Sequence, residues 1–122
     1  MAQINLTNMT VPQLVERFEA IGVAQDDADT EGNRRKYNRL FWQMEAVENE
    51  LKARPGDARS ELLSLYNHPN MEVRLKATKA TLAVAPASAR KALEAIRDTK
   101  WPQALGAGMT IYALDQGIFK PA

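Results

Sequence analysis

Helix signals recur along the whole sequence while strand signals are nearly absent, and this contrast constrains the fold most. In "TVPQLVERFEAIG", Thr10 precedes Gln13 by three residues in a capping-box pattern, and Pro12 falls in the first turn. Apolar residues then recur at helical spacing, at Leu14, Val15, Phe18 and Ile21. The same kind of pattern appears six times, so the sequence predicts an all-α chain of about six helices.

Glycine, proline and polar stretches between the periodic segments set the expected boundaries. The length of 122 residues suits one domain. We expect an N-terminal capping helix over residues 1–23 that ends at Gly22, an acidic loop, and a long helix over 31–54. Two helix pairs then fill 57–117, the last helix ending at Gly117. Ile118 and Phe119 in the segment 118–122 are expected to fold back as a hydrophobic clasp.

The apolar periodicity also predicts which face of each helix is buried. In the long second helix the stripe runs through Tyr37, Leu40, Phe41, Met44, Val47 and Leu51. In the fourth helix, which Asn70 caps, it comprises Val73, Ala77, Ala80, Thr81 and Val84; in the fifth it comprises Ala89, Leu93 and Ile96. In the sixth helix we expect Leu105, Met109, Tyr112 and Ala113 to face inward.

The C-terminal half contains a weak internal repeat. A shift of 32 residues matches Val73 with Leu105 and Ala77 with Met109. Each unit would then be a helix, a tight turn and a second helix, and small residues such as alanine would let neighbouring helices approach closely. Gly106 and Gly108 inside the sixth helix also indicate close helix contact, because glycine otherwise costs a helix about 1 kcal/mol.

The segment "HPNMEVRLKATKATLAV" resembles a HEAT repeat, through Pro69, Val73, Arg74, Ala77 and Leu82. Residues 36–117 also resemble a small bacterial family of HEAT/armadillo-like helical domains of unknown function, through "KYNRLFWQMEAVENELKAR" and "MTIYALDQG". The resemblance implies a right-handed α–α superhelix. HEAT repeats often carry an aspartate at the position of His68, and the second unit has Gly106 at the position of Arg74, so the polar ladder between repeats is not expected in full.

Composition removes several classes of function. There is no cysteine, which excludes disulfides and thiolate metal sites, and His68 is the single histidine, which excludes any site that needs two imidazoles. In its turn, His68 is expected to bond to the backbone. No apolar run approaches the roughly 20 residues of a membrane span, and the N-terminus does not resemble a signal peptide, so we expect a cytoplasmic protein.

No known catalytic motif is present, so we expect neither enzymatic activity nor a cofactor, although an enzyme with an unrecognised site stays an alternative. The acidic segment was considered as a metal site, because Asp27, Asp29, Glu31 and Gly32 fit the start of an EF-hand loop. The twelfth position is Asn38, where a bidentate glutamate is required. We therefore expect no metal site, and acidic residues that cap the second helix instead.

The leading hypothesis is a protein-binding module, either a regulatory adaptor or a toxin-neutralising immunity protein. Trp42 lies about 170° from the buried stripe of its helix and shares that side with Arg35, Asn38 and Arg39. This group could anchor a partner protein or stack on a base, and the concave face of the superhelix is the other candidate surface for a partner. The alternative is that another element covers Trp42, because large aromatic side chains are usually mostly buried.

The second hypothesis is binding of nucleic acid or another anionic partner. It rests on basic residues in the fourth and fifth helices, namely Arg74, Lys76, Lys79, Arg90 and Lys91. The net charge of +1 is well short of a strongly basic nucleic-acid-binding protein, so a solvated charged face is the alternative. Homodimerisation is a further expectation, because a short solenoid has open ends.

Overall fold

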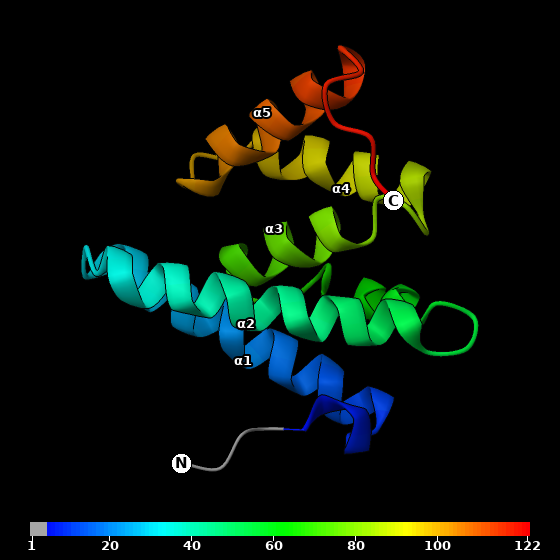
Figure 1. The fold of residues 1–122 in the computed structure, drawn as a ribbon. Helices are drawn as coiled ribbons and strands as arrows, with labels where there is room; N and C mark the ends of the chain where they lie inside the picture. The colour runs from blue at the N-terminus through cyan, green and yellow to red at the C-terminus, as the bar shows by residue number, and fades with distance from the viewer. Residues whose placement is uncertain (1–4) are drawn as a thin grey trace. The chain divides into compact units, whose positions relative to one another are not determined.

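The computed structural model describes residues 5–122, and all regular structure within that range is helical (Figure 1). The elements are η1 (Leu6–Asn8), α1 (Val11–Thr30), α2 (Arg34–Ala53), η2 (Ala58–Leu65), α3 (Met71–Ala80), α4 (Pro86–Arg97) and α5 (Gln103–Asp115). The all-α prediction is therefore confirmed, and the helices other than η1 correspond to the six that were expected. The chain divides into two compact units, the first ending at Glu61 and the second running from Leu62 to Ala122.

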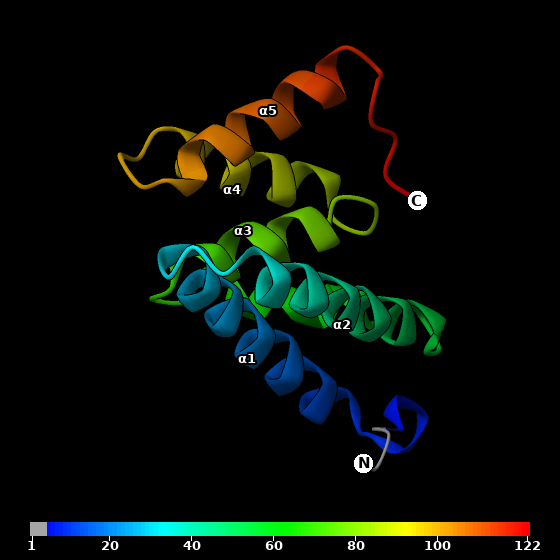
Figure 2. The same cartoon turned by 60° about the vertical axis from the view of Figure 1, so that its left-hand side comes forward.

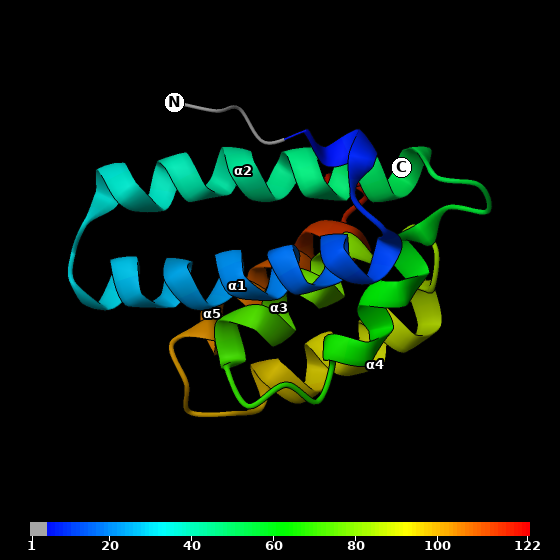
Figure 3. The ribbon, with the colours of Figure 1, turned by 90° about the horizontal axis from the view of Figure 1, so that it is seen from below.

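The first unit is an antiparallel hairpin of α1 and α2 (Figure 3). The capping box forms as predicted, because the Thr10 side chain accepts from the Gln13 backbone N–H while the Gln13 side chain accepts from the Thr10 N–H. Asn33 caps α2 by accepting from the Lys36 N–H at 3.1 Å. Both helices bury apolar stripes, which include Leu14, Phe18, Ile21, Leu40, Met44, Val47 and Leu51.

The end of α1 differs from the prediction. Gly22 is buried inside the helix, which continues to Thr30, so the expected acidic loop forms the last turns of α1. The chain turns instead at Gly32, whose φ of +70° lies in the left-handed region that glycine adopts most readily. The acidic residues therefore lie near the negative end of the α1 dipole and do not cap α2. Burial of Gly22 and Ala28 on the inner face accounts for the extra turns.

Arg54 ties the start of the first unit to the end of α2. Its guanidinium donates to the backbone carbonyls of Leu6 at 3.0 Å and Met9 at 2.8 Å, and to the Glu50 carboxylate at 2.8 Å. The Leu6 carbonyl also accepts from the Met9 N–H at 3.1 Å, so Arg54 adds a second donor to it.

The second unit packs α4 and α5 side by side, and α3 contacts both (Figure 2). Its core includes Leu75, Leu82, Ala89, Leu93, Ile96, Ala107 and Ile111. The first expected helix of this region is η2, a 3₁₀ helix and not an α-helix. Leu62 and Leu65 are nevertheless both buried. A spacing of three suits either helix type, which is why the sequence could not distinguish them.

The turn before α3 forms as predicted. The Asn70 side chain accepts from the backbone N–H groups of Glu72 at 2.9 Å and Val73 at 3.2 Å. His68 Nδ1 accepts from the Asn70 N–H at 2.9 Å, so this histidine is a turn residue bonded to the backbone. Arg74 Nε donates to the His68 carbonyl and so closes the turn against α3.

The orientation of α5 contradicts the prediction. Leu105, Met109 and Tyr112 are 72%, 64% and 62% exposed, whereas Ala107 and Ile111 are buried. Val73 and Ala77, which the 32-residue repeat matches with Leu105 and Met109, are fully buried. Residues that the sequence repeat matches therefore do not have the same burial in the two helices. The side of α5 that carries small residues faces the other helices. A Cβ added at Gly106, for example, would lie 3.4 Å from Leu75 Cδ2 of α3.

The expected C-terminal clasp does not close. Gly117 ends α5 with a φ of +68°, and the Ile118 N–H donates to the Ala113 carbonyl at 2.9 Å, as in a Schellman motif. The Ile118 side chain, however, stays 72% exposed, and Phe119 is 38% exposed. The backbone of the predicted cap is present, but Ile118 does not bury its side chain.

Candidate functional site

The outer side of α2 carries the four residues that the sequence singled out as a partner site. Arg35, Asn38, Arg39 and Trp42 are all exposed, at positions i, i+3, i+4 and i+7 of one helix. We call these four residues the α2 patch. Trp42 is 66% exposed, which contradicts the alternative that another element covers it.

Phe41 extends the aromatic surface of the α2 patch. It was predicted to be buried but is 46% exposed, and its ring meets the Trp42 indole edge to face, with centroids 5.2 Å apart and an interplanar angle of 86°. Such aromatic pairs are stabilised by about 0.5–1.5 kcal/mol beyond area burial. The contact restrains the indole at the surface of α2. Sequence periodicity missed Phe41 because it lies at the edge of the buried stripe.

The residues that match the start of an EF-hand loop lie at the end of α1 and in the turn that follows it. Asp27 and Asp29 lie on the last turns of α1 and not in a loop, so they do not form the first half of a calcium loop. Within residues 5–122, no three side chains of the metal-binding types gather closely enough to hold an ion. At the start of α2, the Arg34 guanidinium carbon lies 6.0 Å from the centre of the Tyr37 ring.

The basic residues of the second unit do not form one uniformly positive face. Lys76 pairs with the Glu72 carboxylate at 3.2 Å, and Arg90 pairs with Asp115 at 2.6 Å and with Glu94 at 3.8 Å. The Arg90 bond lowers the pKa of the Asp115 carboxyl below its ordinary value. These carboxylates neutralise much of the local charge, which weakens the case for a phosphate-binding surface.

Glu72 has a structural role that the sequence did not reveal. Its carboxylate is buried, where it accepts from Gln103 Nε2 at 3.0 Å in addition to pairing with Lys76. Gln103 opens α5, so this bond connects the first turn of α3 with that of α5. A contact with a residue 31 positions away leaves no local sequence signal, so this role could not be predicted.

Two of the five basic residues do come together, in a groove of about 380 Å³ in the second unit. Arg74 on α3 and Lys91 on α4 both line it, together with Asn67, Ser88 and an apolar floor that includes Ile96. None of the described residues that line the groove is acidic. The groove can therefore receive a carboxylate or another anionic group, with a guanidinium donor from α3 and an ammonium donor from α4.

Tyr66 lines this groove as a neutral group. Its hydroxyl shares a short hydrogen bond with Thr81 Oγ1, and burial raises the pKa of the Tyr66 phenol above its ordinary value. The hydroxyls of Thr78 and Thr99, which also line the groove, already donate to backbone carbonyls. Hydrogen-bond donation to an anion would thus fall to Arg74, Lys91, Ser88 and Asn67.

None of the helices in the described part of the chain combines the length and the apolar character needed to cross a membrane.

A family model described as a domain of unknown function, DUF2019, matches residues 12–115. No curated protein matches the chain. Among solved structures, the chain is similar to the protein RPA1889 from Rhodopseudomonas palustris CGA009, with 51% identity and a TM-score of 0.95. That match covers 98% of this chain and 100% of the other.

Proposed function

The chain belongs to the DUF2019 family, and from its exposed surfaces we propose that it is a non-enzymatic protein–protein interaction module. The observation that carries the proposal is the exposed indole of Trp42, stacked edge to face on Phe41 and flanked by Arg35 and Arg39. Tryptophan and arginine are the residue types most enriched among those that dominate binding energy at interfaces. An exposed pair of large aromatic rings is consistent with such a contact, since a partner would remove both rings from water.

The chemistry of the α2 patch suits recognition better than catalysis. An indole, a carboxamide and two guanidinium groups offer contact area, hydrogen-bond donors and positive charge. None of them is a nucleophile or a proton acceptor at neutral pH. The preferred partner surface therefore combines an apolar depression for Trp42 with carboxylates placed to meet Arg35 and Arg39.

We also propose, as a finer statement of the fold, that the helices wind as in HEAT/armadillo proteins. The antiparallel pairs α1–α2 and α4–α5 support it, as does the turn built by His68, Asn70 and Arg74. The unequal burial of the matched residues in α3 and α5 counts against a regular repeat. A cytoplasmic adaptor and an immunity protein both fit a module of this kind.

Replacing Trp42 with alanine tests the proposal. Tagged wild-type protein is used to capture partners from an extract of the source cells, and each captured protein is then purified and titrated against both forms. We expect Trp42→Ala to weaken binding at least tenfold, the loss typical of a dominant interface residue. Asn49→Ala, a neighbouring exposed change on the same helix, should bind like the wild type.

The same variant must keep its fold for the result to count. Because Trp42 is mostly exposed, the free energy of unfolding should change by no more than about 0.5 kcal/mol. A loss of about 2–5 kcal/mol, as for a core truncation, would show that Trp42 is structural. Unchanged affinity in a stably folded variant would reject the α2 patch as the binding surface.

A further inference from the structure

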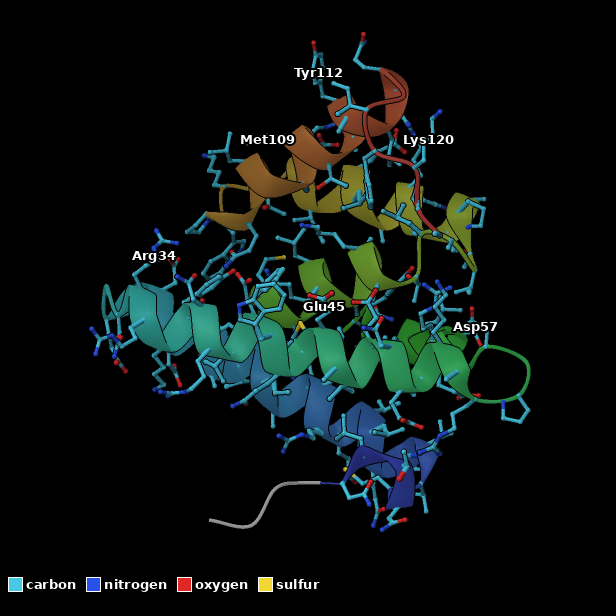
Figure 4. The ribbon with its side chains drawn as sticks, in the orientation of Figure 1. Arg34, Glu45, Asp57, Met109, Tyr112 and Lys120 are labelled. Atoms are coloured by element: carbon cyan, nitrogen blue, oxygen red, sulfur yellow. The ribbon has the colours of Figure 1, made fainter. Side chains whose placement is uncertain are left out.

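The exposed face of α5 is the largest row of apolar side chains at the surface of the second unit. Trp101, Leu105, Met109 and Tyr112 are each more than three-fifths exposed. Leu105, Met109 and Tyr112, at i, i+4 and i+7, lie on one side of α5, and Trp101 lies two residues before the helix begins. We call these four residues the α5 stripe. Figure 4 shows Tyr112 pointing away from α4, which packs on the opposite side of α5.

The α5 stripe has no charge along its length. Between Gln103 and Asp115 the sole charged side chain is Asp115, at the last position, and its carboxylate is paired with Arg90 at 2.6 Å. An exposed apolar row of this size is at the upper end of what monomeric proteins show and often marks a contact surface. The absence of charge also means that two such faces can meet without repulsion between like charges and without desolvating an ion.

We propose that the α5 stripe pairs with the α5 stripe of a second copy of this chain, with the two helices antiparallel about a twofold axis. The order of the side chains is the reason for this choice. Along the sequence, the midpoint of Trp101 and Tyr112 lies between Gly106 and Ala107, and the midpoint of Leu105 and Met109 is Ala107. A twofold axis beside Ala107 therefore sets each Trp101 against Tyr112 of the other copy, and each Leu105 against Met109 of the other copy.

Antiparallel pairing is also electrostatically favourable. The negative end of each α5 dipole lies beside the positive end of the other. Lys100, which is exposed just before α5, comes to the C-terminal end of the second helix, where a cation is stabilised. A parallel arrangement would align the two dipoles and place the two Lys100 ammonium groups side by side.

The size of the α5 stripe predicts a weak dimer. Four large side chains exposed to this extent offer roughly 500 Å² per copy, or about 1,000 Å² in total, at the lower limit of specific interfaces. The dimer should therefore form and dissociate with protein concentration. This inference does not depend on the α2 patch, so it can fail or succeed separately from the proposed function.

Molar mass as a function of concentration tests the pairing. By sedimentation equilibrium, the wild type should move from the monomer mass of 13.6 kDa towards twice that value as concentration rises. Leu105→Asp should stay monomeric with an unchanged helical circular dichroism spectrum, because residue 105 is mostly exposed. Trp42→Asp, an equally exposed apolar-to-acidic change on α2, should dimerise like the wild type.

Cysteine cross-linking tests the register, and the chain is suited to it because it has no native cysteine. Leu105→Cys and Met109→Cys proteins, mixed and oxidised, should give a disulfide-linked dimer, since the twofold axis brings residue 105 of one copy opposite residue 109 of the other. Either variant alone should give far less product, because its two cysteines are separated by roughly 6 Å more along the helix axis. A wild type that is monomeric at every concentration would overturn the proposal. Equal cross-linking of the single variants, or loss of the dimer in Trp42→Asp, would also overturn it.

Discussion

Asp57 is the one described residue other than glycine with a positive φ, at +55°. Aspartate and asparagine tolerate this left-handed conformation better than other residues, because their short side chains bond to nearby backbone. Asp57 also accepts from the backbone N–H of Arg59 at 3.3 Å and from its guanidinium at 2.9 and 2.7 Å. The Arg59 side-chain bonds lower the pKa of the Asp57 carboxyl below its ordinary value.

This lowered pKa predicts a dependence of stability on pH. The stabilisation by the Asp57–Arg59 pair is fully present above the unfolded aspartate pKa of about 3.9. It is lost as the pH falls through the lower pKa of the folded state. Asp57→Asn keeps the tolerance of positive φ but removes the charge, so it should unfold more easily at pH 7, by about 0.2–1 kcal/mol. Urea unfolding from pH 7 to pH 2.5 should show the two proteins converging in acid; a constant difference would assign the effect to backbone geometry.

Single side chains were predictable from the sequence only where the helix had one clear apolar side. In α2 the apolar stripe correctly placed Leu40, Met44, Val47 and Leu51 in the core, whereas the exposure of Trp42 was left open by the sequence. In α5 almost every residue is apolar or small, so periodicity alone could not choose between Leu105 and Ala107. The informative signal was the small size of Gly106 and Gly108, whose Cβ positions face Leu75 of α3 and Arg97 of α4.

At the scale of elements, side-chain caps predicted helix ends reliably, whereas glycines predicted them only in part. The capping box at Thr10, the cap at Asn70 and the left-handed Gly117 all formed. Gly22 was wrong as a helix end, because its inner-face burial in α1 offsets the intrinsic cost of glycine. What a glycine does therefore depends on packing that its local sequence does not contain.

Gly108 in α5 allows a direct test of how much a glycine inside a helix costs in stability. It has helical φ, and a Cβ there would meet Arg97 Cγ at 3.6 Å, an ordinary contact with a flexible side chain. We expect Gly108→Ala to stabilise the protein by up to about 1 kcal/mol, because alanine loses less conformational entropy in a helix. Gly117→Ala is the matched control, and it should destabilise because Gly117 has a φ of +68°. Thermal unfolding of both variants checks that the two changes in stability have opposite signs. A destabilised Gly108→Ala would mean that the Arg97 side chain of α4 cannot move to make room for the added methyl group.

At the scale of the whole molecule, charge separates the two functional hypotheses. The sequence shows the total charge and the positions of the charged residues. It does not show that Arg90 pairs with Asp115, and for Lys76 and Glu72 only their i, i+4 spacing hinted at a pair. Arg74 and Lys91 alone come together at the groove of the second unit. Nucleic-acid affinity grows with the number of phosphates that cations neutralise, and on the basic residues of α3 and α4 that number is small.

We therefore expect no measurable binding of duplex DNA or single-stranded RNA at about 0.15 M salt. Any weak binding at about 0.05 M should depend only shallowly on salt, since few counterions are released. Asp115→Asn frees Arg90 from its closest carboxylate, so it should raise the low-salt affinity, whereas Asn49→Ala should not. Fluorescence anisotropy of labelled oligonucleotides over a salt series measures each case. A tight complex with a steep salt dependence would instead show that arginine and lysine side chains leave their carboxylate partners for phosphates, and would make nucleic acid the leading partner.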